Sequence, residues 1–364
     1  GLVVARHLLN AAARVNVFMC GEVGQLSPDA RTNYEILARM TSRIYPLREE
    51  TDLQYFIMSL LEADMVVDAI YGIGFRGSLG EFEARLAGLV NQSKCPLLAV
   101  DIPSGLEADT GRINGEAFKA DYTVTFALPK LGMVQGKGRD YVGQLTVADI
   151  SIPGALLLDE QIKLQMITEE MVKLHFQPRL RETHKGSYGH ALIIGGSPGM
   201  SGAPVMASWA ALRCGTGLVT LALPEKIMGA ASVVPEVMSR GLPFTLTGAI
   251  SGEACTIIEN LLGTASVCAI GPGMSRYAEG NMVVRTVLEK AGIPVLIDAD
   301  GLNALQSDVG ILKDRQVPVV ITPHPGEMSR LTKLSVEEIQ NQRIEISRHY
   351  SVEWGVTIVL KGNN

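Results

Sequence analysis

The 364-residue sequence has no run of basic residues, no closely spaced pair of cysteines and no long apolar segment. Its formal charge is −6, so its charge gives no support for nucleic-acid binding. No uninterrupted apolar run reaches the roughly 20 residues that a membrane-spanning helix needs, and we find no signal peptide. We therefore expect a cytoplasmic protein whose partners are small molecules, with no nucleic acid and no membrane.

The five cysteines do not suggest a disulfide framework. None of them forms a C-x-x-C pair, and most lie in apolar runs. We therefore expect buried, reduced thiols, which fit a reducing compartment.

Glycine and apolar residues are abundant. The 38 glycines and a hydrophobic content of 47% are typical of a well-packed α/β protein with many tight turns. The chain exceeds the usual size of one hydrophobic core, so we predict two domains, residues 1–175 and 176–364, with a polar linker at 177–183. The sequence opens within a helical pattern and ends just after an apolar strand, so we expect a fragment of a longer protein.

Apolar strands alternate with helical patterns. In the first domain we predict helices at 2–13, 33–40, 52–62 (capped by Thr51) and 80–91, and strands at 15–20, 65–71, 96–101, 120–128 and 143–152. This alternation predicts a mostly parallel sheet with helices on both faces. In the second domain we predict a helix at 205–213 and strands at 191–194, 218–223, 267–270, 295–297, 319–321 and 356–360. Ligands bind at the carboxyl ends of the strands in such sheets, so polar residues there are candidate site residues.

A glycine-rich segment at 184–204 lies just past the middle of the chain. The strand 191–194 runs into Gly195 and Gly196, and a helix follows a loop of small residues. This order places backbone N–H groups and a helix N-terminus where they can bind phosphate. A tight turn without a ligand is the alternative.

Two features of the first domain indicate a binding site. Residues 72–77 match G-x-G-x-x-G between a strand and a helix, and Asp101 stands where such a motif has its acidic partner. Asp68 lies inside an apolar strand, where a carboxylate is costly unless it is paired or liganded. A hydrogen bond to the following loop is the alternative for Asp68.

The segment from Asp101 to Gly105 brings a carboxylate and the hydroxyl of Ser104 into one tight turn. These groups provide oxygen ligands for a cation and a candidate base. A turn without chemistry is the alternative.

Polar or glycine-rich loops follow four strands of the second domain, at 271–273, 298–303, 322–327 and 361–362. Four such strand ends predict one shared site. Alternatively, Asp298 and Asp300 cap a helix and His324 is a packed loop residue.

The segments 68–77, 100–105, 120–126 and 129–132 resemble the YjeF N-terminal domain, a Rossmann-like NAD(P)HX epimerase that interconverts the R and S forms of hydrated NADH or NADPH. The resemblance implies potassium ligands at Asp68 and Ser104, and a catalytic, substrate-contacting carboxylate at Asp101. It also implies a substrate loop made of Gly72, Ile73, Gly74, Phe75, Arg76, Gly77 and Ser78. The family's Asn-Asn-Gly-Gly-Asp loop would stand before Gly1 and is not in this sequence.

The segments 185–190, 202–204, 214–218, 270–273, 298–300 and 323–327 resemble the YjeF C-terminal domain, a ribokinase-like NAD(P)HX dehydratase driven by ADP or ATP. The resemblance implies that Ala203, Gly273 and His324 line the hydrated nucleotide. Lys361 and Gly362 would contact the adenine nucleotide, which we expect to bind with Mg²⁺. The family's glycine-rich segment with the catalytic aspartate would follow Asn364 and is not in this sequence.

Together the resemblances imply an epimerase joined to a dehydratase that returns NAD(P)H. The fused order looks bacterial, so ADP is the expected phosphoryl donor, and we expect a homo-oligomer. One alternative is a kinase for a small alcohol or vitamin with an accessory nucleotide-binding domain. A second alternative is a nucleotide-binding module without catalytic activity.

Overall fold

The computed structural model describes residues 1–157, 159–176, 178, 181–313 and 315–362. It forms two compact units, Gly1–Ile167 and the described residues from Thr168 to Gly362. The domain boundary at 175/176 stays a prediction. Three residues of the expected linker, at 177, 179 and 180, lie outside the described residues.

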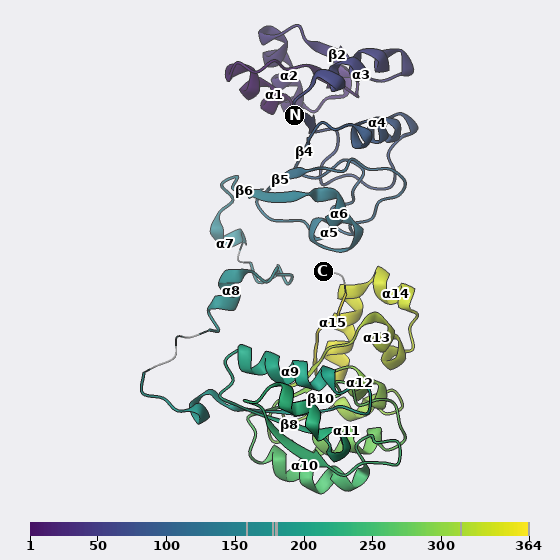
Figure 1. Ribbon diagram of the computed structural model, residues 1–364. Coiled ribbons are helices and arrows are strands. Elements are labelled where there is room, and N and C mark those ends of the chain that lie inside the picture. The colour runs from purple at the N-terminus through teal and green to yellow at the C-terminus, as the bar shows by residue number, and fades with distance from the viewer. Residues whose placement is uncertain (158, 177, 179–180, 314, 363–364) are drawn as a thin grey trace. The chain divides into compact units, whose positions relative to one another are not determined.

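The first unit contains a four-stranded sheet whose strands all run parallel, in the order β3-β4-β5-β6. Figure 1 labels β4, β5 and β6 of this sheet. A separate parallel pair is formed by β1 and β2. The strands are β1 (Val17–Met19), β2 (Ile44–Pro46), β3 (Val66–Asp68), β4 (Leu97–Val100), β5 (Tyr122–Phe126) and β6 (Gln144–Ala148). The helices are α1 (Leu2–Asn10), α2 (Pro28–Met40), α3 (Leu53–Glu62), α4 (Glu81–Gln92), α5 (Leu131–Val134), α6 (Arg139–Val142) and α7 (Gly154–Leu157).

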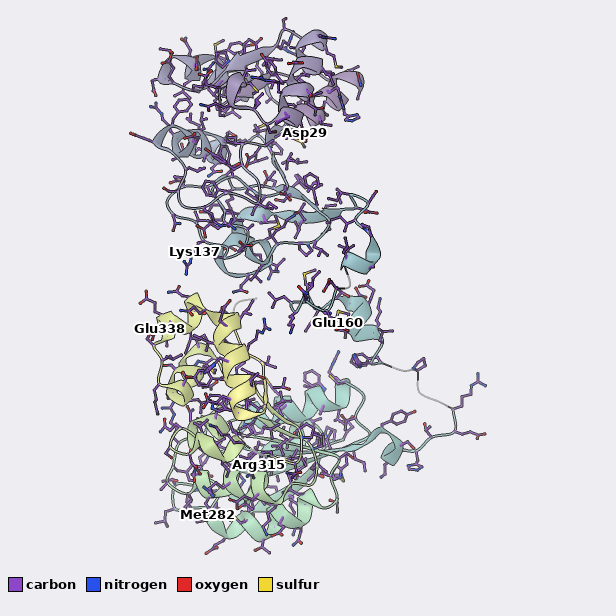
Figure 2. All side chains as sticks on the ribbon, turned by 180° about the vertical axis from the view of Figure 1, so that it is seen from behind. Asp29, Lys137, Glu160, Met282, Arg315 and Glu338 are labelled. Carbon is purple, nitrogen blue, oxygen red and sulfur yellow. The ribbon has the colours of Figure 1, made fainter. Side chains whose placement is uncertain are left out.

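The core of this unit follows from the period-two pattern of β4. Leu97 and Ala99 are buried and belong to the same hydrophobic cluster as Leu86 and Val90 of α4. A second cluster forms around Ile102 and Met133, beyond the ends of β4 and β5. Side chains therefore fill the space that the ribbon leaves between helices and sheet (Figure 2).

Two helix starts of the first unit differ from the sequence prediction, and in the second unit the helix predicted at 205–213 begins at Gly202. Helix α2 begins at Pro28 rather than residue 33, because the Ser27 hydroxyl accepts a hydrogen bond from the backbone of the first turn. Thr51 does not cap α3, and that prediction is wrong. A single 3₁₀ turn, Glu50–Asp52, comes first, and the reciprocal capping bonds there are made by Glu49 and Asp52.

The second unit contains a seven-stranded parallel sheet in the order β13-β12-β11-β10-β7-β8-β9. Its strands are β7 (His190–Ile194), β8 (Leu218–Pro224), β9 (Met238–Leu242), β10 (Val267–Ile270), β11 (Val295–Ile297), β12 (Val319–Ile321) and β13 (Thr357–Ile358). Its helices are α8 (Glu169–Lys173), α9 (Gly202–Arg213), α10 (Cys255–Leu262), α11 (Gly280–Lys290), α12 (Asp300–Ala304), α13 (Pro325–Thr332), α14 (Val336–Asn341) and α15 (Arg343–Trp354).

Strand β7 shows how helices cover both faces of this sheet. Leu192 and Ile194 belong to the larger cluster, which includes residues of α10 and α11. Ala191 and Ile193 point to the opposite face and pack with residues of α9. Four buried residues in succession are expected for a central strand of a parallel sheet that is covered on both faces.

The predicted α/β class with parallel sheets is thus confirmed. In the part of the chain that the structure describes, no helix is long and apolar enough to cross a membrane. All five cysteines are unpaired, but only Cys268 is buried and Cys214 is exposed, so the expectation of uniformly buried thiols is wrong.

Candidate active sites

Asp68 and Ser104 form a buried pair in the first unit. Asp68 ends β3 and is 3% exposed, and Ser104 is fully buried in the turn after β4. The Ser104 hydroxyl donates to Asp68 Oδ1 at 2.7 Å, and the Ser104 backbone N–H donates to Oδ2 at 2.7 Å. The Ser104 oxygen in turn accepts from the Tyr71 backbone at 3.0 Å. The ends of two neighbouring strands are therefore joined through one carboxylate.

Burial raises the pKa of the Asp68 carboxyl, against the lowering effect of its hydrogen bonds from Ser104 and Ile70. Within the described residues no cationic side chain forms an ion pair with it. The oxygens of Asp68 and Ser104 form a hard, negatively charged donor set, which is what an alkali cation needs. The pair fits the expected potassium ligands, and Asp68 also bonds to the following loop, as the alternative proposed. The ion itself stays a prediction.

The glycine loop 72–78 lies between β3 and α4 and lines a cavity of about 450 Å³. Gly77 has φ +86°, a conformation that glycine adopts without strain. Phe75 is buried, with its ring centroid 5.1 Å from that of Tyr71, while Ile73 is 53% exposed. The cavity is lined by Ile70, Tyr71, Gly72, Gly74, Phe75, Arg76 and Ser78. Most of the predicted substrate loop therefore faces one open space.

A second segment, 107–114, holds this loop in place, and the sequence analysis missed it. The Gly77 N–H donates to Glu107 at 3.1 Å, and the Asn114 amide donates to the Gly77 carbonyl at 3.2 Å. Arg76 pairs with Asp109 and donates to two carbonyls of its own loop. The hydrogen bonds of Glu107 to Thr110 and Gly77 lower its pKa.

Asp101 lies just after β4, beside the glycine loop. Its φ of +70° is in the left-handed region, which Asp tolerates better than most residues. Its Oδ2 would lie 3.6 Å from a Cβ built on Gly72. The structure therefore brings the predicted catalytic carboxylate to the predicted substrate loop.

Lys130 is a further residue of this site that the sequence analysis did not single out. It follows β5, and its ammonium group lies 2.7 Å from Asp101 Oδ1. The only signal in the sequence was its place in the segment 129–132 that carried part of the resemblance. Recognising the contact requires knowing that β4 and β5 are neighbours.

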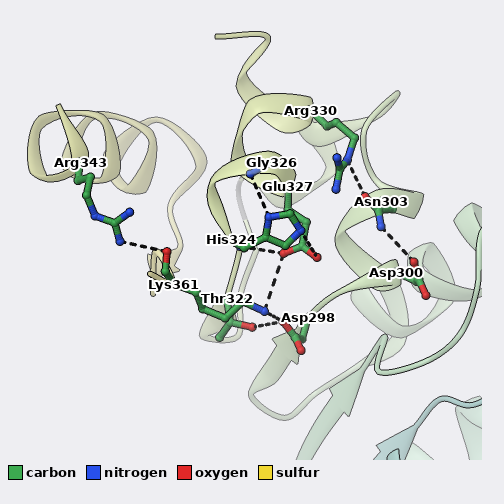
Figure 3. A network of polar contacts seen from close by, with 10 residues as sticks. All are labelled: Asp298, Asp300, Asn303, Thr322, His324, Gly326, Glu327, Arg330, Arg343 and Lys361. Carbon is green, nitrogen blue, oxygen red and sulfur yellow. Dashed lines mark hydrogen bonds and ion pairs between the residues drawn. The ribbon is translucent and has the colours of Figure 1, made fainter. Parts of the chain in front are cut away.

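In the second unit, three adjacent strand ends meet at Asp298 (Figure 3). Asp298 follows β11, and its Oδ1 accepts from the Thr322 hydroxyl at 2.7 Å and from the Lys361 ammonium at 2.6 Å. Thr322 follows β12 and Lys361 follows β13. Lys361 also lies 3.8 Å from the buried carboxylate of Glu327. The structure thus joins three of the four predicted strand-end loops by side-chain contacts, and the fourth, at 271–273, lies against the backbone of Asp298.

His324 caps α13 at the same edge of the sheet. Its side-chain Nδ1 accepts from the Gly326 backbone N–H at 3.0 Å, and the His324 backbone N–H donates to Glu327 Oε2 at 2.8 Å. Because Nδ1 is an acceptor, the imidazole proton is on Nε2, which lies 3.4 Å from Glu327 Oε1. The side chain is half exposed, so His324 is a helix cap with an accessible ring rather than a packed loop residue.

Asp300 belongs to a neighbouring set of contacts. One of its oxygens accepts from the Ser275 N–H at 2.9 Å. The other accepts from the Asn303 amide at 3.0 Å, and Arg330 donates to Asn303 at 2.8 Å (Figure 3). The cap position of α12 is Ala299, with no side-chain capping bond. The alternative that Asp298 and Asp300 simply cap a helix is therefore wrong.

The glycine loops lie close to this network. A Cβ on Gly271 would come within 1.9 Å of the Asp298 carbonyl, and one on Gly273 within 2.3 Å of the Met200 carbonyl. The Ser197 hydroxyl donates to the Gly273 carbonyl at 2.9 Å. Gly273 thus contacts the loop that precedes α9. Ala203 lies in the first turn of α9, directly after this loop. These approaches leave no space for a side chain at Gly271 or Gly273.

The chain is similar to known proteins along its whole length. A family model described as YjeF-related protein N-terminus matches residues 1–132, and one described as NAD(P)H-hydrate dehydratase matches residues 191–364. The chain is 43% identical to the bifunctional NAD(P)H-hydrate repair enzyme Nnr of Moorella thermoacetica, covering 100% of this chain and 68% of that protein. The protein of the same name from Escherichia coli is 37% identical, with 82% of this chain and 55% of that protein covered.

One solved structure is an ADP/ATP-dependent NAD(P)H-hydrate dehydratase from Bacillus subtilis, co-crystallised with ATP/Mg²⁺. It is 31% identical and aligns with a TM-score of 0.46, covering 56% of this chain and 68% of that chain.

Proposed function

The chain belongs to the family of bifunctional NAD(P)H-hydrate repair enzymes, and we propose that it returns hydrated NADH and NADPH to their active forms. One unit interconverts the R and S epimers of the hydrate, and the other removes water from the S epimer. The observation that supports this most is that each unit contains its own polar site at strand ends, in the order of the two matching families. Family membership also argues against a kinase for a small alcohol or vitamin.

In the first unit, Asp101 is the residue that exchanges a proton with the substrate. Epimerisation requires a bond at the hydrated carbon to break and form again, and a positioned carboxylate lowers the barrier to the accompanying proton transfer. The glycine loop binds the nucleotide through backbone N–H groups and is held in shape by Glu107 and Asn114. A potassium ion on Asp68 and Ser104 would supply positive charge for the substrate's diphosphate.

In the second unit, phosphorylation converts the ring hydroxyl into a better leaving group, and elimination of phosphate then gives NAD(P)H. The transferred phosphoryl group comes from ADP, so the products are AMP and phosphate. We assign Lys361 to binding the nucleotide phosphates, and His324 and Gly273 to lining the hydrated ring. Asp298 is already engaged by Lys361 and Thr322, so we assign it to positioning Lys361 rather than to binding Mg²⁺.

The proposal extends to ADP over ATP as donor, to Mg²⁺ with the nucleotide, to a cytoplasmic location and to a homo-oligomer. The cytoplasmic location is supported by five cysteines that form no disulfide. The fused order of the two units supports ADP.

The test is an absorbance assay on mixed R- and S-hydrated NADH with ADP, with ATP or with neither. Full recovery of NADH with ADP is expected, at a higher rate than with ATP. Recovery of only the S fraction would exclude the epimerase activity. No recovery with either nucleotide would contradict the proposed function and favour binding without turnover.

A further inference from the structure

We propose that Lys130 is a positioning residue of the epimerase site, which fixes the Asp101 carboxylate so that only Oδ2 faces the substrate. The inference rests on the proposed epimerase function of the first unit. Nothing in the sequence pattern assigns a role to this lysine, and it lies outside the predicted substrate loop.

The contacts of the Lys130 ammonium group use all of its donors. It lies 2.7 Å from Asp101 Oδ1, 2.6 Å from Thr125 Oγ1 and 3.1 Å from the Phe126 carbonyl. An ammonium group has three N–H donors, so each one has an oxygen acceptor within the protein. Lys130 therefore has no donor left for the substrate, and its effect must pass through Asp101.

Thr125 completes the arrangement. It is fully buried, and its hydroxyl donates to Asp101 Oδ1 at 3.1 Å while accepting from Lys130. Both hydrogen bonds to the carboxylate thus fall on the same oxygen. No described residue donates to Oδ2, which lies on the Gly72 side. Oδ2 is therefore the oxygen that can exchange a proton with a ligand on the glycine loop.

The burial of the pair makes this restraint effective. The Lys130 and Asp101 side chains are 19% and 16% exposed, so solvent screens their attraction less than it screens a surface ion pair. Asp101 also has a positive φ, and its side chain direction follows from that backbone conformation. Thr125 lies in β5 and Lys130 follows it, whereas Asp101 follows β4. Their hydrogen bonds therefore connect the turn at Asp101 to the neighbouring strand and limit rotation of the Asp101 carboxylate.

The test measures epimerisation by the full-length protein with Lys130→Met, Lys130→Ala and Lys130→Arg. Lys119→Met is the matched control, because Lys119 is exposed in the same unit and has no ion pair within the described residues. Dehydration of the pure S epimer by the same proteins reports on the second unit. For Lys130→Met we expect kcat to fall about 100-fold, the scale of a lost general base, with KM within about threefold.

Two further readouts separate positioning from folding. Added methylammonium is expected to restore kcat of Lys130→Ala in a saturable manner, since it can occupy the vacated ammonium position. Lys130→Arg keeps the charge, but its planar fork cannot reproduce the three contacts, so we expect an intermediate kcat.

The outcomes distinguish the inference from the function on which it rests. Wild-type protein without epimerase activity would overturn the proposed function, and the inference with it. An active wild type with Lys130→Met at the same kcat, a loss carried by KM alone, or no rescue by methylammonium would overturn the inference only. If Lys130→Met fails to fold, the inference is tested by Lys130→Arg, and a wild-type kcat for epimerisation in that variant would also overturn it.

Discussion

The ammonium group of Lys361 lies 2.6 Å from the carboxylate of Asp298, although 63 residues separate them in the sequence. The contact exists because β13, β12 and β11 are consecutive strands of one parallel sheet, so their carboxyl ends lie at the same edge. Thr322, at the end of the middle strand, shares the same carboxylate oxygen. The dehydratase site that we propose depends on this arrangement of strand ends.

Loss of Asp298 should therefore weaken nucleotide binding rather than binding of the hydrate. Asp298→Ala frees Lys361 and leaves the Thr322 hydroxyl without its acceptor, which should cost about 1–3 kcal/mol of stability. We expect KM for ADP to rise about tenfold, and that for the hydrate to change little. Steady-state kinetics and thermal unfolding measure both effects.

Lys361→Met should show the same selective rise in KM for ADP, with Lys226→Met as an exposed control. Equal effects on both substrates, or none, would contradict the role assigned to this pair.

We assign His324 two roles, a helix cap and a side chain of the proposed dehydratase site, which a pair of variants can separate. It caps α13 through Nδ1 and presents its ring at the site. Asn is a good N-cap residue, so His324→Asn should keep the stability of the wild type, whereas His324→Ala should lose about 1 kcal/mol. Both variants should reduce the dehydratase rate. A rate that follows stability alone, normal in the Asn variant and reduced in the Ala variant, would leave His324 with only a structural role.

Potassium should stabilise the first unit through Asp68. The carboxylate is buried and has no cationic partner within the described residues, so a bound cation would offset the cost of its charge. Replacing tetramethylammonium chloride by potassium chloride at constant ionic strength should raise the melting temperature of the wild type. Asp68→Asn and Ser104→Ala should not respond. An equal response of all three proteins would show that the salt acts elsewhere.

Alkaline pH should destabilise the second unit through Cys268. Burial raises the pKa of this thiol from 9.0 to about 12, so the folded protein retains a proton that the unfolded chain loses. The unfolded state then binds fewer protons, and stability falls as pH rises above about 9 and towards 12. Cys268→Ala should flatten this part of the curve of unfolding free energy against pH, at the expense of a small cavity. An unchanged slope would exclude Cys268 as the cause.

Among the described strands, the sequence predicted all except β2 and β9. Strands β10, β11 and β12 have the predicted limits, because they are apolar runs whose alternate side chains are buried in the larger hydrophobic cluster. Strand β9 was missed because Ser239, Arg240 and Gly241 interrupt the apolar run. It lies at the edge of the sheet, and three of its five residues are exposed. Within the described residues strand β2 pairs with β1 alone, and it was missed because its sequence, Ile44, Tyr45 and Pro46, is not an aliphatic run and contains no buried residue.

The candidate sites were predictable to the extent that their residues follow strands directly. Asp101 and Asp298 do so, and His324 lies three residues after β12. Each stands in a short polar or glycine-rich loop, which is why it was predicted. Lys130 and the segment 107–114 act across the fold, on residues that lie 29 or more positions away in the sequence. A single sequence does not reveal such pairs, because they follow from strand order and loop packing rather than from local patterns.

The central claim is that one chain epimerises the hydrate and then dehydrates it, with Asp101 needed only for the first step. The most direct test follows NADH recovery from the pure R epimer and from the pure S epimer, with ADP, for the full-length wild type and Asp101→Asn. Asn tolerates the positive φ of this position, so the fold should be kept. The exposed Asp140→Asn serves as the control.

We predict recovery from both epimers by the wild type and the control. Asp101→Asn should recover NADH from the S epimer at the wild-type rate, and from the R epimer at least about 100-fold more slowly. Recovery from the R epimer by Asp101→Asn at the wild-type rate, or no recovery from the S epimer by the wild type, would contradict the account.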